Sequence, residues 1–136
     1  MVNKGRPFYG YARVKTVGIS AIAVAATTTE VAVFAAPFRC KIMKCSIIAN
    51  TTLTGQDTHY QTLGFKNKGS AGAGTSVIAS KAFTNAVNAT ALAETNIGTV
   101  SNNLLREGDT ITFYKAVTGN GHATPALIAK VEYVKV

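Results

Sequence analysis

The last third of the chain alternates apolar and polar residues in two long runs. In the first run, 110–117, Ile111 and Phe113 point one way and the residues between them point the other. A loop at 118–125 that contains Gly, Asn, His and Pro separates it from the second run, 127–133, in which every second residue is apolar. This pattern predicts an antiparallel ribbon of two strands with one buried face. Because such a ribbon is not stable alone, earlier segments must complete its sheet or pack a second sheet on it.

Earlier apolar segments predict the remaining strands. They are residues 12–26, 30–36, 38–50, 58–67, 76–83 and 97–100. The face of 38–50 that is basic at its start becomes apolar later, which indicates either a strand that passes from the rim into the core or a bulge near Lys44. Residues 84–95 fit either a short helix or irregular edge structure. About eight short strands favour an all-β fold, an antiparallel β-sandwich of the jelly-roll type, ahead of an open barrel.

The composition indicates a folded chain with a single domain. Hydrophobic residues make up 47% of the 136 residues and charged residues 15%, which is typical of a globular protein and not of a disordered one. We expect one β-sandwich domain over residues 12–136. We expect an extended arm at residues 1–11, where no helical or strand periodicity is sustained.

The predicted arm combines basic and aromatic residues without any acidic residue. Aromatic side chains on a free tail are expected to dock, either on the chain's own domain or on a neighbouring subunit. We therefore take this segment as the candidate contact region for subunit binding. Its candidate binding residues are Lys4, Arg6, Pro7, Phe8, Tyr9, Tyr11 and Arg13.

The charge is strongly positive, with 14 Lys and Arg against 6 Asp and Glu and a net charge of +8. This excess predicts an acidic partner, whether nucleic acid, a membrane surface or a protein. The arm has the aromatic and basic residues with which single-strand binders stack bases, but the strands carry no RNA-binding aromatic pattern and no basic helix is predicted. A small β-barrel module that binds nucleic acid through this arm is therefore the alternative function, ranked below a structural role.

An apolar run at 17–26 follows several basic residues, which is the order typical of a signal peptide. The run is too short to span a bilayer and ends in Thr27-Thr28-Thr29-Glu30. We therefore interpret it as a strand and expect no membrane partner.

Two cysteines, Cys40 and Cys45, lie five residues apart on one predicted strand. At that spacing they should face opposite sides of the strand and cannot easily form a disulfide with each other. They have no neighbouring cysteine or histidine with zinc-ligand spacing, so we expect buried free thiols in a reducing compartment.

No catalytic, cofactor-binding or metal-binding site is predicted. Asp57 and His59 would share a strand face and could hydrogen-bond, but the chain has no Gly-x-Ser-x-Gly element to supply a nucleophile. The glycine-rich segment 69–75 lacks the Lys-Ser/Thr pair of a phosphate-binding loop and is interpreted as a mobile hairpin loop. The acidic residues that flank Gly108 indicate a turn, with too few oxygen ligands for calcium.

Several turn and strand elements after residue 58 occur in the order found in a known family. They are Thr58-His59-Tyr60-Gln61-Thr62-Leu63, the connector from Asn67-Lys68-Gly69 to Gly74-Thr75, Gly108-Asp109-Thr110-Ile111, and Gly119-Asn120-Gly121 before the last strand. In this order the chain resembles the jelly-roll decoration (cement) proteins of tailed bacteriophage capsids. The resemblance covers residues 58–136 and consists of strands and turns, without a catalytic signature.

This resemblance implies a non-enzymatic viral structural protein that binds the outside of a phage head. It implies a homotrimer whose partner is the major capsid protein, with terminal arms that reach across the seams between capsid subunits. It also implies synthesis in the host cytoplasm, a final location on the virion surface and no cofactor. A minor capsid or head-fibre role is not separated from decoration at this level.

Overall fold

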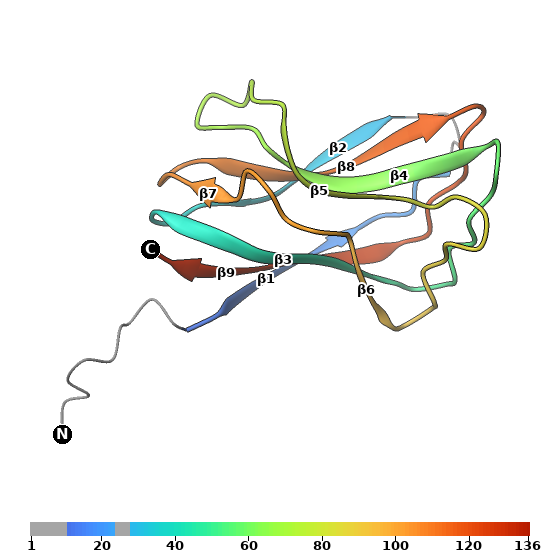
Figure 1. The fold of residues 1–136 in the computed structure, drawn as a ribbon, viewed down its shortest axis with the longest axis horizontal. Helices are drawn as coiled ribbons and strands as arrows, with labels where there is room; N and C mark the ends of the chain where they lie inside the picture. The colour runs from blue at the N-terminus through green and yellow to red at the C-terminus, as the bar shows by residue number, and fades with distance from the viewer. Residues whose placement is uncertain (1–10, 24–27) are drawn as a thin grey trace.

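The computed structural model describes residues 11–23 and 28–136 of the chain. Within these residues the fold consists of nine strands and no helix. The strands are β1 (Arg13–Ile19), β2 (Thr29–Ala35), β3 (Cys40–Ala49), β4 (Tyr60–Asn67), β5 (Ser76–Ala82), β6 (Glu94–Asn96), β7 (Leu104–Leu105), β8 (Thr110–Thr118) and β9 (Leu127–Lys135). They form two antiparallel sheets packed face to face, so the all-β sandwich expected from the sequence is confirmed (Figure 1). A search of the same residues for a helix that could cross a membrane finds none.

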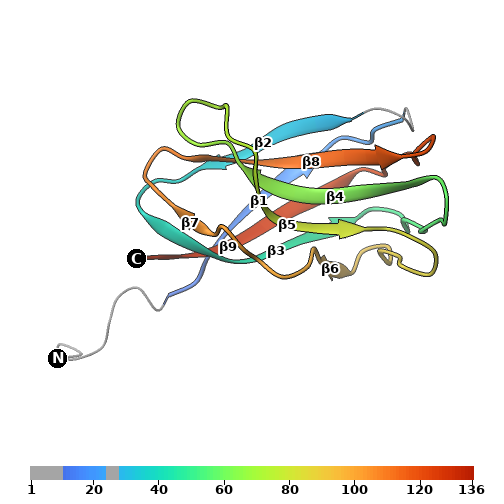
Figure 2. The same cartoon turned by 45° about the horizontal axis from the view of Figure 1, so that its top comes forward.

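The strands pair as a long hairpin that is folded over on itself. Sheet I has the order β1-β9-β3-β6, with β7 also beside β3, and sheet II has the order β2-β8-β4-β5. The first strand thus pairs with the last, β2 with β8, β3 with both β6 and β7, and β4 with β5. β6 and β7 both pair with β3 and so occupy one place in sheet I. The nine strands therefore fill the eight strand places of a jelly roll, four in each sheet (Figures 1 and 2).

Alternate residues of each strand point between the sheets and fill the core. Phe65 of β4 and Phe113 of β8 lie opposite each other, and their rings meet edge to face with centroids 5.7 Å apart. Burying each apolar side chain of this kind stabilises the fold by about 1.5–3 kcal/mol. The largest fully buried side chains are Phe65, Phe83, Phe113, Lys115, Ile42, Ile47, Leu53, Leu63, Ile78, Ile97, Leu105 and Ile111.

A bulge keeps β3 facing the core along its whole length. Its pairing with β9 shifts register between Ile42 and Lys44, which leaves Met43 exposed. Because of this shift, Cys40 and Cys45 both face the core and are fully buried. The expectation that they face opposite sides was wrong, since it assumed an unbroken strand. The prediction of buried free thiols is confirmed, and burial raises the pKa of the Cys45 thiol to about 12.

The ribbon predicted for the last third of the chain is not formed. β8 lies in sheet II between β2 and β4, whereas β9 lies in sheet I between β1 and β3. Residues 119–126 carry the chain across the roughly 10 Å that separates two packed sheets. Buried polar groups hold this crossing loop, because Lys115 Nζ donates to His122 O at 2.7 Å and Gln61 Nε2 donates to Ala123 O at 3.2 Å.

Two shorter segments decide expectations from the sequence: one predicted strand is absent, and one open choice between helix and irregular structure falls to irregular structure. The strand predicted at 97–100 is wrong, because the strand β6 ends at Asn96 and Gly98 then has a φ of +93°. Residues 84–95 contain no helix. Ala86 and Leu92 there adopt φ angles of 65° and 61°, in the left-handed region that interrupts regular structure.

Tyr114 is buried although its side chain lies on the outer face of sheet II. Gly64 is its partner in register on β4, and a Cβ at position 64 would lie 2.6 Å from both Tyr114 Cε1 and Ala79 O. The ring therefore rests on the bare backbone of Gly64. Lys66 Nζ covers it from outside, 4.4 Å from the ring centroid.

The outer face of sheet I carries a network of charges around Glu94 of β6. The Glu94 carboxylate accepts a hydrogen bond from Ser46 Oγ at 2.6 Å and lies 3.2 Å from Lys44 Nζ and 3.3 Å from Lys130 Nζ. Lys130 also pairs with Glu132 at 3.5 Å. This network joins β6 to β3 and β9 and neutralises the middle of the sheet.

The contact between Gly64 and Tyr114 predicts a site-specific sensitivity to a single methyl group. We expect Gly64→Ala to lower the free energy of unfolding by about 1–3 kcal/mol, because the new Cβ would force the ring and the backbone apart. Gly18→Ala is the matched control, since no atom lies within 4 Å of a Cβ at that strand position. We expect it to be neutral or to stabilise by up to about 1 kcal/mol. Urea titrations measure both, and equal losses would contradict the packing argument.

The Glu94 network predicts a loss of stability in acid. Hydrogen bonds from Ser46, Lys44 and Lys130 lower the pKa of Glu94 from 4.5 to about 2. Because the folded-state pKa is the lower one, this stabilisation is fully present above pH 4.5 and is lost as the pH falls through about 2. We expect Glu94→Gln to lower the free energy of unfolding at pH 7 by about 1 kcal/mol or less, as for a solvated ion pair. Urea unfolding at several pH values measures this difference, and a difference that persists below the folded-state pKa would be evidence against the network.

Candidate interaction surface at one end of the sandwich

One end of the sandwich brings together the starts of β1 and β3, the end of β9, and β7 (Figures 1 and 2). Arg13 of β1 lies opposite Tyr133 of β9, and Cys40 of β3 lies between Lys135 of β9 and Leu105 of β7. Cations from separate segments of the chain therefore meet here. We call this region the basic end and define it by Arg13, Arg39, Lys41, Arg106 and Lys135.

Aromatic rings hold two of these cations. The Phe38 ring lies 5.0 Å from the Arg13 guanidinium carbon and 5.3 Å from Lys135 Nζ. Tyr133 packs beside Phe38 with centroids 6.3 Å apart, and Phe34 packs on Tyr133 at 5.0 Å. Ring faces attract cations without neutralising them, so Arg13 and Lys135 are positioned while they keep their full charge.

Three of the six acidic residues are engaged in ion pairs away from this end, whereas Glu107 and Asp109 lie beside Arg106. Among the described residues, the ion pairs join Glu30 to Lys68 and join Glu94 and Glu132 to lysines in the middle of sheet I. Asp109 lies nearer the basic end, but its carboxylate accepts the Arg106 backbone N–H at 3.0 Å and faces Asn67 Nδ2 at 3.4 Å. None of the five cations that define the basic end takes part in these ion pairs. The five cations outnumber the two acidic residues beside them, so this end of the molecule carries a net positive charge.

Apolar side chains are exposed among these cations. Tyr11 and Val14 are exposed at the start of β1, and Val136 is exposed just after β9. Lys41 lies between Val134 of β9 and Leu104 of β7. Exposed apolar atoms interspersed with basic groups are typical of a protein contact surface.

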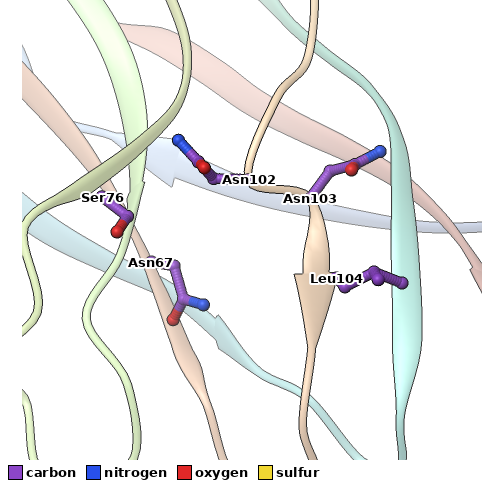
Figure 3. Close-up of a pocket in the computed structure, with 5 residues that line it drawn as sticks. All are labelled: Asn67, Ser76, Asn102, Asn103 and Leu104. Atoms are coloured by element: carbon purple, nitrogen blue, oxygen red, sulfur yellow. The ribbon is translucent and has the colours of Figure 1, made fainter.

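Two adjoining hollows open beside the basic end. One of about 490 Å³ is lined by Arg39, Leu104, Leu105 and Arg106, and one of about 360 Å³ is lined by Asn67, Ser76, Asn102, Asn103 and Leu104 (Figure 3). Leu104, whose side chain belongs to both hollows, is 55% exposed. Asn67 and Ser76 are opposite each other on β4 and β5 of sheet II, so the second hollow lies between the edges of the two sheets. We call the combined depression the edge groove.

The structure places only part of the contact segment expected from the sequence. Tyr11 is exposed just before β1, and Arg13 begins β1 and stacks on Phe38. The expected contact residues that lie outside the described part of the chain are Lys4, Arg6, Pro7, Phe8 and Tyr9.

Sequence reasoning missed most of the basic end. The basic start of the segment 38–50, with Arg39 and Lys41, is visible as a pattern, but it indicates only a strand that enters the core from the rim or a bulge near Lys44. No local signal connects Arg106 or Lys135 with them. These two residues arrive through the pairing of β7 and β9 with β3.

The candidate catalytic pair from the sequence does not meet. Asp57 and His59 lie in bends before β4, and His59 Nδ1 accepts the backbone N–H of Asn120 at 3.0 Å. His59 thus connects two loops. In the part of the chain that the structure describes, no group of three or more His, Cys, Asp or Glu residues is placed to hold a metal ion.

Comparison with known proteins supports the fold assignment. No protein-family model and no curated protein sequence matches the chain. A chain of the cyanophage Pam1 capsid asymmetric unit is similar with a TM-score of 0.53 and 18% identity, over 100% of this chain and 93% of that chain. A chain in the structure of infectious bursal disease virus, Gx strain, gives a TM-score of 0.41 and 9% identity, over 91% of this chain and 32% of that one. The cyanophage likeness extends over the whole two-sheet fold, and at this identity it concerns the fold alone.

Proposed function

We propose that this chain is a non-enzymatic structural protein of a virion: a decoration (cement) protein that binds the outside of a phage head and bridges neighbouring capsid subunits. The observation that carries the proposal is the basic end, where cations outside the ion pairs of the described residues gather with exposed apolar side chains. The cyanophage likeness supports it, because that chain belongs to a capsid asymmetric unit and is nearly equal in length to this one.

The charge distribution suits attachment to an acidic capsid exterior. A field concentrated at one end orients the molecule as it approaches, so that the basic end and the segment leading into β1 meet the shell first. The exposed apolar side chains at this end then supply contact area that excludes water. In this proposal Tyr11, Arg13 and the residues before them form one contact region with the rest of the basic end.

Bridging follows from multivalency. A homotrimer of this domain would present three basic ends, and several weak contacts on the major capsid protein would combine into strong attachment. A protein that binds only the assembled shell stabilises that shell by mass action. The sandwich itself supplies rigidity, since nested strand pairs form its core and buried loop residues such as Leu53, Phe83 and Ala89 complete it. The protein would be made in the host cytoplasm and end on the virion surface.

Charge reversal tests the attachment surface. We expect Lys41→Glu/Lys135→Glu to weaken co-sedimentation with undecorated capsids of the cognate phage at least about tenfold, because it removes attraction and introduces repulsion at the contact. Lys15→Glu/Lys81→Glu is the matched control, with the same change in net charge outside the basic end as defined. Both variants should keep the parent's thermal melting transition. Equal losses of capsid binding in the two variants, or no loss in either, would contradict the proposed surface.

Removal of the N-terminal segment tests its part in the contact. We expect deletion of residues 1–11 to abolish capsid binding and to leave the melting transition nearly unchanged, because β1 begins at Arg13. Normal decoration of capsids by the truncated protein would rule out a binding role for residues 1–11.

Light scattering of the intact protein should give a trimer. A monomer in light scattering would rule out the homotrimer. Tight binding of single-stranded DNA that falls steeply with salt, together with no capsid binding, would favour nucleic acid as the partner instead.

A further inference from the structure

We propose that the edge groove binds an extended acidic peptide segment of another protein, which pairs with the outer edge of β7 and places its carboxylates against Arg39 and Arg106. This inference names the chemistry of the partner segment. It rests on the proposed function only where that partner is identified as a capsid protein.

The backbone of β7 is oriented to accept a further strand. Among the described residues β7 pairs only with β3. Ile42 N–H donates to Asn103 O at 2.8 Å, so this pair is hydrogen-bonded, and the next pair along, Lys41 and Leu104, is of the non-hydrogen-bonded type. A residue in such a pair directs its backbone N–H and C=O away from the partner strand. Leu104 therefore presents both groups on the side away from β3, as strand addition requires.

A fixed amide side chain lies next to this edge. Asn102 Nδ2 donates to Val77 O at 3.1 Å, which holds the side chain in place and leaves its amide oxygen as an acceptor for an N–H group of a bound segment. Asn103 instead points toward β3, where its Nδ2 donates to Ile42 O at 2.8 Å and helps to fix β7 (Figure 3). The exposed Leu104 side chain at the junction of the two hollows offers an apolar contact for a residue of that segment.

The charge of the groove selects an acidic segment. Arg39 and Arg106 line one hollow and are both exposed, and no acidic residue lines either hollow. The neighbouring Glu107 lines neither hollow, and the Asp109 carboxylate is turned toward the Arg106 backbone and Asn67. Guanidinium groups bind carboxylates through two parallel hydrogen bonds, so acidic side chains spaced along an extended chain match this site.

Two other occupants fit the groove less well. A second copy of this chain offers no extended acidic segment, because its six acidic residues are dispersed and the two that are spaced as alternate residues, Glu107 and Asp109, flank the turn at Gly108. A single-stranded nucleic acid would need aromatic platforms for its bases, and neither hollow is lined by an aromatic side chain. An acidic peptide of another protein satisfies both the backbone edge and the charge.

The test uses the full chain and a capped synthetic octapeptide that alternates Asp or Glu with Leu or Val, labelled for fluorescence anisotropy. We expect it to bind, and we expect the same peptide with Asn and Gln in place of its acids to bind at least about tenfold more weakly. Amide NMR signals of residues 102–106 should shift on binding. Arg39→Glu/Arg106→Glu should weaken binding at least about tenfold, and the charge-matched Lys15→Glu/Lys81→Glu should weaken it much less.

Leu104→Pro separates strand addition from charge attraction. Proline removes the outward N–H of Leu104, a group that the pairing with β3 does not use, so the fold should persist and peptide binding should be lost. Leu104→Ala keeps that N–H and should retain most of the binding. A melting transition near that of the parent protein shows that each variant is folded.

Opposite outcomes overturn the proposal. Equal binding of the acidic and amidated peptides, NMR shifts confined to other residues, or full binding by folded Leu104→Pro would each do so. Heparin that binds the groove more tightly than the peptide would assign it to anionic polysaccharide instead. If the protein binds capsids but not the peptide, the edge groove is not an acidic-peptide site and the proposed function stands. If the peptide binds in the groove but capsids do not bind, the groove remains a peptide site and the proposed function fails.

Discussion

The pairing of β3 with β9 is the interaction on which the rest of the structure depends. It runs from Cys40 opposite Lys135 to Ala49 opposite Leu127, so it joins an early segment to the end of the described chain. β1 adds to one side of this pair, and β6 and β7 add to the other. Sheet I therefore exists only when these distant segments meet, and sheet II then buries the apolar faces of both. Such non-local pairing is the physical basis of the nested jelly-roll order.

The same pairing decides where the charges lie. Glu94 and Glu132 are drawn into the middle of sheet I, where lysines surround them, and Glu30 pairs with Lys68 beside sheet II. What remains is a sandwich with paired charges in the middle of sheet I and a cluster of cations at the basic end that take no part in these ion pairs. A net charge alone would attract acidic partners from every direction. Because the cations of the basic end lie together, the attraction also orients the protein as it approaches an acidic partner.

Exposed sheet edges are the other general constraint on this fold. An unpaired edge invites aggregation, and proteins commonly protect it with basic residues or by keeping the edge strand short. Both devices are present here, since β1 carries Arg13 and Lys15 and β7 has only two residues. Beside β7, Arg39 and Arg106 disfavour edge-to-edge pairing of two copies while they remain open to an acidic partner. Protection against self-association and selection of a binding partner thus have the same electrostatic origin.

Much of the local structure follows from the sequence. Alternation identified most of the strands, including β8 and β9, and the turn around Gly108 and the bulge near Lys44 were recognisable from residue type and spacing. The burial of both thiols was also expected. These features depend on short-range physics, namely the two-residue period of a strand and the backbone freedom of glycine.

The sequence could not assign strands to sheets. β8 and β9 have the same alternation whether they form a hairpin or lie in different sheets, because a pattern of period two reports only that one face is buried. For the same reason Arg106 and Lys135 had no visible connection with Arg13. The sequence by itself determined most of the strands, the buried thiols and the excess of positive charge. The tertiary structure alone decided which strands are neighbours, and through those long-range hydrogen-bonded pairings it placed the five cations of the basic end and the edge groove at one end of the molecule.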